Sequence, residues 1–168
     1  MRMIVPTLIL ALAACSPAPV APPNASEAEP APIESGIPPA PTPSPTPITL
    51  GRVTEAAAAQ VIGELRCAFL SDASDLLLVG AGDVDKASRA TAVVMRGATP
   101  VLLTARAPGG FDAMAQGGSF TDAELTASIT RGAPRETEHE GSSHTATLSV
   151  EAPGSAPVAI DGVWECGP

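Results

Sequence analysis

The stretch Leu125-Thr126-Ala127-Ser128-Ile129-Thr130 alternates apolar side chains with hydroxyl side chains. A period of two is the period of a β-strand, because successive side chains point to opposite faces of a sheet. The stretch therefore predicts a strand with Leu125, Ala127 and Ile129 facing a core and the hydroxyl groups facing water. The stretch Ala146-Thr147-Leu148-Ser149-Val150 repeats the pattern and predicts a second strand of the same kind.

Shorter apolar segments on both sides of these stretches predict further strands. They are rich in aliphatic and β-branched residues and are separated by glycine, proline and aspartate. The segments are residues 67–69, 76–79, 91–95, 101–105 and 158–166, with turns expected at residues 80–83 and 97–100 and a bend or bulge at Asp161-Gly162. About seven or eight short strands with this punctuation predict a mainly β domain, either a small antiparallel β-barrel or a β-sandwich.

A short helix is predicted before the strands, over residues 54–66. Thr54 is a suitable N-cap, and the negative charge of Glu55 suits the positive end of a helix. Gly63 costs about 1 kcal/mol relative to alanine in a helix, so it weakens the last turn. Apolar side chains recur on one face at helical spacing, at Ala58, Val61, Ile62 and Leu65.

The chain begins with one basic residue, Arg2, and an apolar run over residues 3–12 that leads into Leu12-Ala13-Ala14-Cys15. This run is about half of the roughly 20 residues that a transmembrane helix needs. The four residues resemble the lipobox of bacterial lipoprotein precursors. The resemblance implies a signal peptide over residues 1–14, a lipidated Cys15 and a protein anchored in the bacterial cell envelope, with Ser16 implying the outer membrane, facing the periplasm. A plain secretory signal is the alternative.

Residues 15–51 predict a disordered tether between the lipid and the domain. Twelve of the nineteen prolines lie between Pro17 and Pro47, and lysine and arginine are absent from Met3 to Gly51. Proline fixes φ and removes amide donors, so such a segment favours an extended, polyproline-like spacer. The remaining residues, 52–168, have the length of one domain.

The charge of this domain restricts its partners. Fifteen of the eighteen acidic residues and eight of the nine basic residues follow Gly51, which gives residues 52–168 a formal charge of −7. A field of this sign opposes nucleic acid and favours a basic partner. Aromatic residues are scarce, so the core must be largely aliphatic.

Cys67 and Cys166 remain once Cys15 is assigned to the lipid. An even number of cysteines in an oxidising compartment favours a disulfide, and the strand pattern places both cysteines on core-facing positions. Closing a loop of about 100 residues contributes up to ~4.7 kcal/mol in the chain-entropy description. Two buried thiols are the alternative, and a metal pair is disfavoured at this separation.

The segment His139-Glu140-Gly141-Ser142-Ser143-His144 is the best candidate for a metal or catalytic site. The histidines are five residues apart, whereas the zinc-protease helix motif requires four, and Gly141 disfavours a helix. Ser142 and Ser143 lack the Gly-x-Ser-x-Gly turn of a nucleophile. We therefore expect a solvated loop, with His144 at a sheet edge, and no metal, cofactor or enzymatic activity. A metal-assisted hydrolase using His139 and His144 is the enzymatic alternative.

The order of elements within the domain resembles that of the membrane-bound inhibitors of C-type lysozyme. The similarity covers a cysteine in the first strand and one in the last, an apolar-glycine-apolar segment over residues 92–103, the Gly109-Gly110-Phe111 and Gly117-Gly118-Ser119-Phe120 segments, and residues 125–129. It implies a small lipoprotein β-barrel. The serine and lysine segments of that family have no match, because Lys86 is the only lysine and lies elsewhere.

These observations favour a lipid-anchored envelope binding or accessory module without catalytic activity. Its expected partner is a basic protein or an envelope polymer, besides the membrane that holds the lipid. A lysozyme-inhibitor-like protein is the alternative within the binding class, and a purely structural envelope protein would have no specific partner.

Overall fold

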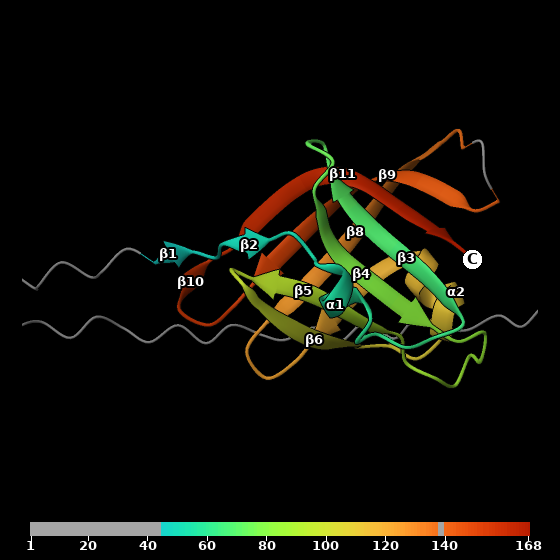
Figure 1. Ribbon diagram of the computed structural model, residues 1–168, viewed down its shortest axis with the longest axis horizontal. Helices are drawn as coiled ribbons and strands as arrows, with labels where there is room; N and C mark the ends of the chain where they lie inside the picture. The colour runs from blue at the N-terminus through green and yellow to red at the C-terminus, as the bar shows by residue number, and fades with distance from the viewer. Residues whose placement is uncertain (1–44, 138–139) are drawn as a thin grey trace, which may run out of the picture. The chain divides into compact units, whose positions relative to one another are not determined.

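A computed structural model describes residues 45–137 and 140–168 (Figure 1). The predicted signal peptide, Cys15 and most of the predicted tether lie outside these residues. The described helices are α1 (Glu55–Ala58) and α2 (Gly110–Ala115). The described strands are β1 (Thr46–Pro47), β2 (Leu50–Gly51), β3 (Leu65–Ser71), β4 (Leu76–Gly82), β5 (Thr91–Arg96), β6 (Thr99–Ala105), β7 (Gly117–Thr121), β8 (Thr126–Arg135), β9 (Ser142–Glu151), β10 (Ser155–Ala156) and β11 (Val158–Gly167).

Eight of these strands form a closed antiparallel barrel in the order β5-β4-β3-β11-β9-β8-β7-β6. Closure comes from β6, which pairs with β7 on one side and with β5 on the other. The prediction of a mainly β domain is thereby confirmed, and the barrel is chosen over the sandwich. An eight-stranded barrel is just wide enough for side chains to fill its interior.

The interior is filled by the alternate residues that the sequence pattern selects. Ala127 and Ile129 in β8 are buried, as are Leu148 and Val150 in β9. The largest fully buried side chains include all but one of the aromatic residues, namely Phe69, Phe120 and Trp164. The predicted inward faces are confirmed, and the core is mostly aliphatic as expected.

A bulge between β3 and β4 explains why residues 76–79 are apolar without alternation. Phe69 pairs with Leu78 and Leu70 pairs with Leu76, so Leu77 is the extra residue. Leu77 packs into the barrel cluster, whereas Leu76 packs against a second cluster. Each of the residues therefore has an apolar neighbour, although they do not face the same side.

The second cluster lies on the outer face of β4 and β5, beneath the segment that contains α1. Val53, Ala57 and Val61 from that segment cover Val79 and Val93, together with Ala81 and Met95. The hydroxyl of Thr54 accepts a hydrogen bond from the amide of Ala57 at 3.2 Å, so the predicted N-cap is confirmed.

The predicted length of this helix is wrong, because α1 ends at Ala58 rather than at residue 66. Ile62 is 85% exposed, and Leu65 already begins β3. Gly63 passes so close to β4 that a Cβ there would lie 2.5 Å from the nitrogen of Gly82. Only a residue without a side chain fits at this close contact with β4, and a helix continued to residue 66 would not bring the chain there.

The folded region begins earlier than the predicted boundary between residues 51 and 52. β1 pairs in parallel with β10, and β2 pairs with β5. Ile48, between them, is only 7% exposed and packs into the barrel cluster. Proline tolerates such edge positions because an edge strand does not need every amide donor. We call residues 46–51 the strap.

Two predicted turns are strand residues instead. β11 pairs with β9 without interruption from Val158 to Cys166, so Asp161-Gly162 is neither a bend nor a bulge. A Cβ at Gly162 would lie 2.0 Å from the oxygen of Leu70, so this glycine permits a close approach of strands. The residues Gly80–Gly82 likewise lie inside β4, and only Asp83 begins the turn.

The helix α2 is not predicted by the sequence pattern and packs against β3, β4 and β7. A Cβ at Gly80 would lie 2.7 Å from the sulfur of Met114, and a Cβ at Gly82 would lie 2.9 Å from the nitrogen of Phe111. These glycines in β4 make room for α2 at one end of the barrel (Figure 1). Neither helix in the described part of the chain is long and apolar enough to cross a membrane.

Candidate functional site

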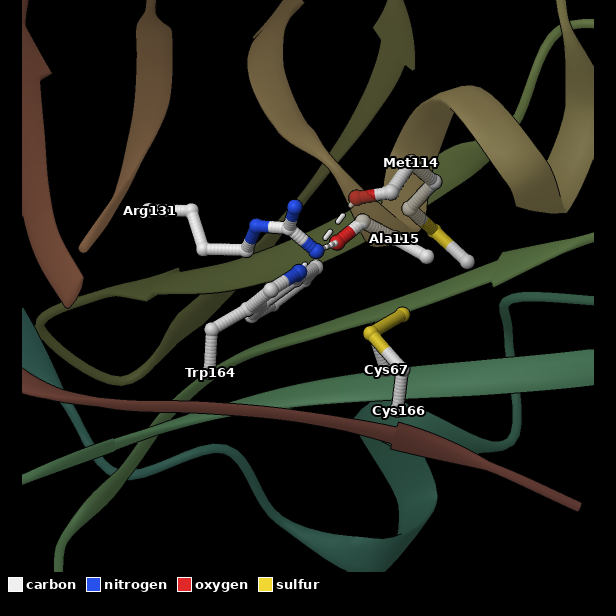
Figure 2. Close-up of a disulfide and its surroundings, with 6 residues drawn as sticks. All are labelled: Cys67, Met114, Ala115, Arg131, Trp164 and Cys166. Atoms are coloured by element: carbon white, nitrogen blue, oxygen red, sulfur yellow. Dashed lines mark hydrogen bonds between the residues drawn. A yellow bond between two sulfur atoms is a disulfide. The ribbon is translucent and has the colours of Figure 1, made fainter. Parts of the chain in front are cut away.

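The end of the barrel that holds α2 is tied together covalently. Cys67 and Cys166 are register partners in β3 and β11 and form the expected disulfide, with an S–S distance of 2.06 Å (Figure 2). Both cysteines are buried and belong to the barrel cluster. The disulfide therefore links the first and last strands of the barrel from inside.

The last turn of α2 is held by side chains from two other strands. Trp164 donates its indole N–H to the oxygen of Met114 at 3.3 Å, and Arg131 donates to the oxygen of Ala115 at 3.1 Å (Figure 2). The final carbonyl groups of a helix have no partner within the helix, so these bonds satisfy them. This end of the barrel is a packed structural unit.

The histidine segment only partly falls within the described residues. His139 lies outside them, whereas Ser142, Ser143 and His144 lie in β9 rather than in a solvated loop. His144 pairs with Trp164 on one side and with Pro134 on the other, so it lies within the sheet and not at the expected edge. The pairing between β9 and the long β11 extends the strand into this segment, which the sequence pattern alone does not reveal.

Within the described residues, His144 and Ser143 are not part of a catalytic or metal-binding arrangement. The Nδ1 atom of His144 is buried and has no hydrogen-bond partner among them, and Ser143 is only 7% exposed. No three His, Cys, Asp or Glu side chains converge within residues 45–137 and 140–168 as a metal cluster would require. Ser143 and His144 are consecutive in β9, so their side chains point to opposite faces of the sheet. Within the described residues neither is joined to a second catalytic group.

The opposite end of the barrel carries an open groove, which we call the mouth groove. It has a volume of about 560 Å³ and lies between the strap, the turn from β3 to β4, and the start of β11. This volume is within the range of roughly 300–1,000 Å³ typical of ligand sites, which often occur in the mouths of β-barrels. Its floor is apolar and consists of Ile48, Leu50, Leu77, Val158 and Ile160.

Three acidic residues also line the groove: Asp72, Asp75 and Asp161. Asp75 is paired with Arg52, whose Nε lies 3.1 Å from Oδ1. Asp161 accepts a hydrogen bond from the hydroxyl of Thr147 at 2.7 Å. Asp72 is exposed, and its amide donates to the main-chain oxygen of Asp161 at 3.2 Å. The groove therefore combines an apolar floor with a negative rim.

Sequence patterns did not identify this groove, because its residues come from three separate segments. Ile48 belongs to the predicted tether, Asp72 and Asp75 to a turn between strands, and Ile160 and Asp161 to the last predicted strand and its bend. The available signal was the pair of apolar residues Ile48 and Leu50 immediately after the proline-rich stretch.

Comparison with known proteins adds no assignment to this geometry. No protein-family model, no curated protein and no solved structure matches the chain.

Proposed function

We propose that the protein is a lipid-anchored module of the bacterial cell envelope that binds a partner and does not catalyse a reaction. The mouth groove is the observation that carries the binding proposal, because it is an open, preformed site with an apolar floor and a negative rim. The interior behind it is filled with side chains, so binding takes place at the surface of the barrel.

The anchor in this proposal rests on Leu12-Ala13-Ala14-Cys15 and the proline-rich residues that follow. A lipid on Cys15 would hold the chain at the membrane, and residues 16–44 would separate the domain from it. The formal charge of −7 over residues 52–168 favours a basic partner through long-range attraction that weakens with salt.

Affinity retention tests the proposal. The full chain, immobilised through its N-terminus, is exposed to envelope extract at low ionic strength, and retained material is eluted with salt and identified by mass spectrometry. We expect a specific basic protein or an envelope polymer that is absent from a control surface. No specific retention would contradict the binding function and favour a purely structural role.

Inhibition of lysozyme is the second candidate function. The eight-stranded barrel with a cysteine pair joining its first and last strands is the arrangement that the family resemblance implies. Lysozyme is a basic protein and suits the charge of the domain. Stoichiometric loss of lysozyme activity in a cell-wall clearing assay would support this candidate, and undiminished activity with excess protein would reject it.

The hydrolase alternative is tested separately. Tight stoichiometric zinc in the purified chain that disappears in the His139→Ala/His144→Ala variant would contradict a non-catalytic function. We expect no stoichiometric zinc in either protein.

A further inference from the structure

We propose that the mouth groove binds a cationic, amphipathic segment of a partner protein, in which lysine or arginine alternates with aliphatic residues. This inference rests on the proposed binding function and specifies both the site and the chemistry of the partner. The apolar floor would take the aliphatic side chains, and Asp72 and Asp161 would take the cationic ones.

The floor presents apolar surface that the fold itself does not cover. Leu50, Val158 and Ile160 are partly buried and pack against the barrel cluster, to which Ile48 and Leu77 belong. Burial of their remaining exposed surface by a ligand is favourable, although the costs of association offset part of this gain. An aliphatic side chain seated on them would extend the existing core without opening the barrel.

Main-chain hydrogen bonds hold the strap against the barrel. The amide of Gly97 donates to the oxygen of Thr49 at 2.9 Å, and just after the strap the amide of Val53 donates to the oxygen of Leu76 at 2.7 Å. The pairing of β1 with β10 holds the other end of the strap. A preformed wall reduces the ordering cost that binding would otherwise carry.

The acidic residues of the rim favour a cationic ligand. Arg52 forms an ion pair with Asp75, whereas Asp72 and Asp161 have no basic partner among the described residues. The main-chain bond between these two residues keeps their backbones adjacent, and Thr147 orients the carboxylate of Asp161. Asp161 alternates with Ile160 along β11, so its carboxylate lies on the outer face of the barrel, at the rim of the groove. A guanidinium or ammonium group at this rim would therefore meet Asp161 and the exposed Asp72 while aliphatic side chains rest on the floor.

Charge also argues against two other occupants of the groove, the tether of this chain and a second copy of the domain. Residues 16–44 of this chain contain Glu27, Glu29 and Glu34 and no basic residue, so the rim would repel them. A second copy of the domain carries the same net negative charge. A cationic partner is the occupant that complements the groove.

A direct binding measurement with the full chain tests this inference. The probe is a short fluorescein-labelled peptide of alternating leucine and lysine, and the matched control peptide alternates leucine and glutamate. We expect the lysine peptide to bind with an affinity that falls as salt is added. Its binding should shift the NMR signals of Leu77, Val158 and Ile160. We expect no binding of the glutamate peptide.

Two variants with conservative charge removal locate the site. Asp72→Asn/Asp161→Asn retains the hydrogen-bond acceptor for Thr147. It should lower the affinity for the lysine peptide about five- to tenfold, which is the size expected for the loss of two exposed ion pairs. Asp112→Asn removes an exposed charge in α2, at the other end of the barrel, and should change affinity by less than about twofold. The fluorescence of the buried Trp164 confirms that both variants are folded.

Equal weakening by the two kinds of variant would overturn the inference, because binding would then depend only on net charge. Binding of the glutamate peptide, or a dimer in sedimentation that dissociates in the Asp72→Asn/Asp161→Asn variant, would also overturn it. If envelope extract still supplies a specific partner that the double variant retains equally well, the groove assignment fails while the proposed binding function stands.

Discussion

Trp164 in β11 and Met114 in α2 are joined inside the barrel by a hydrogen bond from the indole nitrogen to the main-chain oxygen, at 3.3 Å. The two residues are separated by 50 positions in the chain. The bond adds a side-chain donor to a carbonyl in the last turn of α2, and both side chains are buried in the barrel cluster. This contact joins α2 to the wall of the barrel.

Replacement of Trp164 by phenylalanine should therefore lower the free energy of unfolding substantially. The oxygen of Met114 would lose its donor in a buried site, which costs about 1–3 kcal/mol, and the smaller ring would leave a cavity that adds to this. Urea unfolding followed by circular dichroism measures the change. Val163→Ala, a partly exposed neighbour on the same strand, is the matched control and should cost less than about 1 kcal/mol. Equal losses in the two variants would contradict the role of Trp164.

The strap should contribute to stability although the sequence pattern assigns it to the tether. Ile48→Ala removes a side chain that is 7% exposed, and should cost about 2–4 kcal/mol on unfolding. Ile62→Ala makes the same chemical change at a residue that is 85% exposed, and should stay within about 0.5 kcal/mol. Similar values for the two isoleucines in urea unfolding would show that residues 46–51 are not part of the folded domain.

The disulfide should stabilise the domain because it closes a long loop. Cys67→Ala/Cys166→Ala should lower the free energy of unfolding by about 2–5 kcal/mol. A reducing agent should have a comparable effect on the unmodified chain and none on the variant. If reduction does not change the urea midpoint of the unmodified chain under conditions where both thiols become alkylated, this prediction fails.

The lipid anchor should depend on one sulfur atom. Cys15→Ala should abolish labelling with a palmitate analogue and release the protein from the membrane fraction, because the thiol is the proposed site of acylation. Ser16→Ala leaves that thiol in place and should keep the label. Unchanged membrane fractionation of the Cys15→Ala variant would contradict lipidation.

The sequence by itself determined which side chains face the core. Alternation at Ala127, Ile129, Leu148 and Val150 is a local property of a strand, since neighbouring side chains must point to opposite faces. The same parity placed Cys67 and Cys166 inward, and the structure pairs them. The cap at Thr54 was also predictable, because an N-cap depends on residues within one turn.

The tertiary structure alone decided how the strands close and what occupies the two ends. Barrel closure requires β6 to pair with both β5 and β7, and a period of two is the same in a barrel and in a sandwich. The seat of α2 depends on the missing side chains of Gly80 and Gly82, which as isolated glycines are typical of a turn. The mouth groove exists only because the strap, a turn and β11 meet at one end of the barrel. Such contacts between distant segments are set by packing of the whole core, which no local pattern in the sequence encodes.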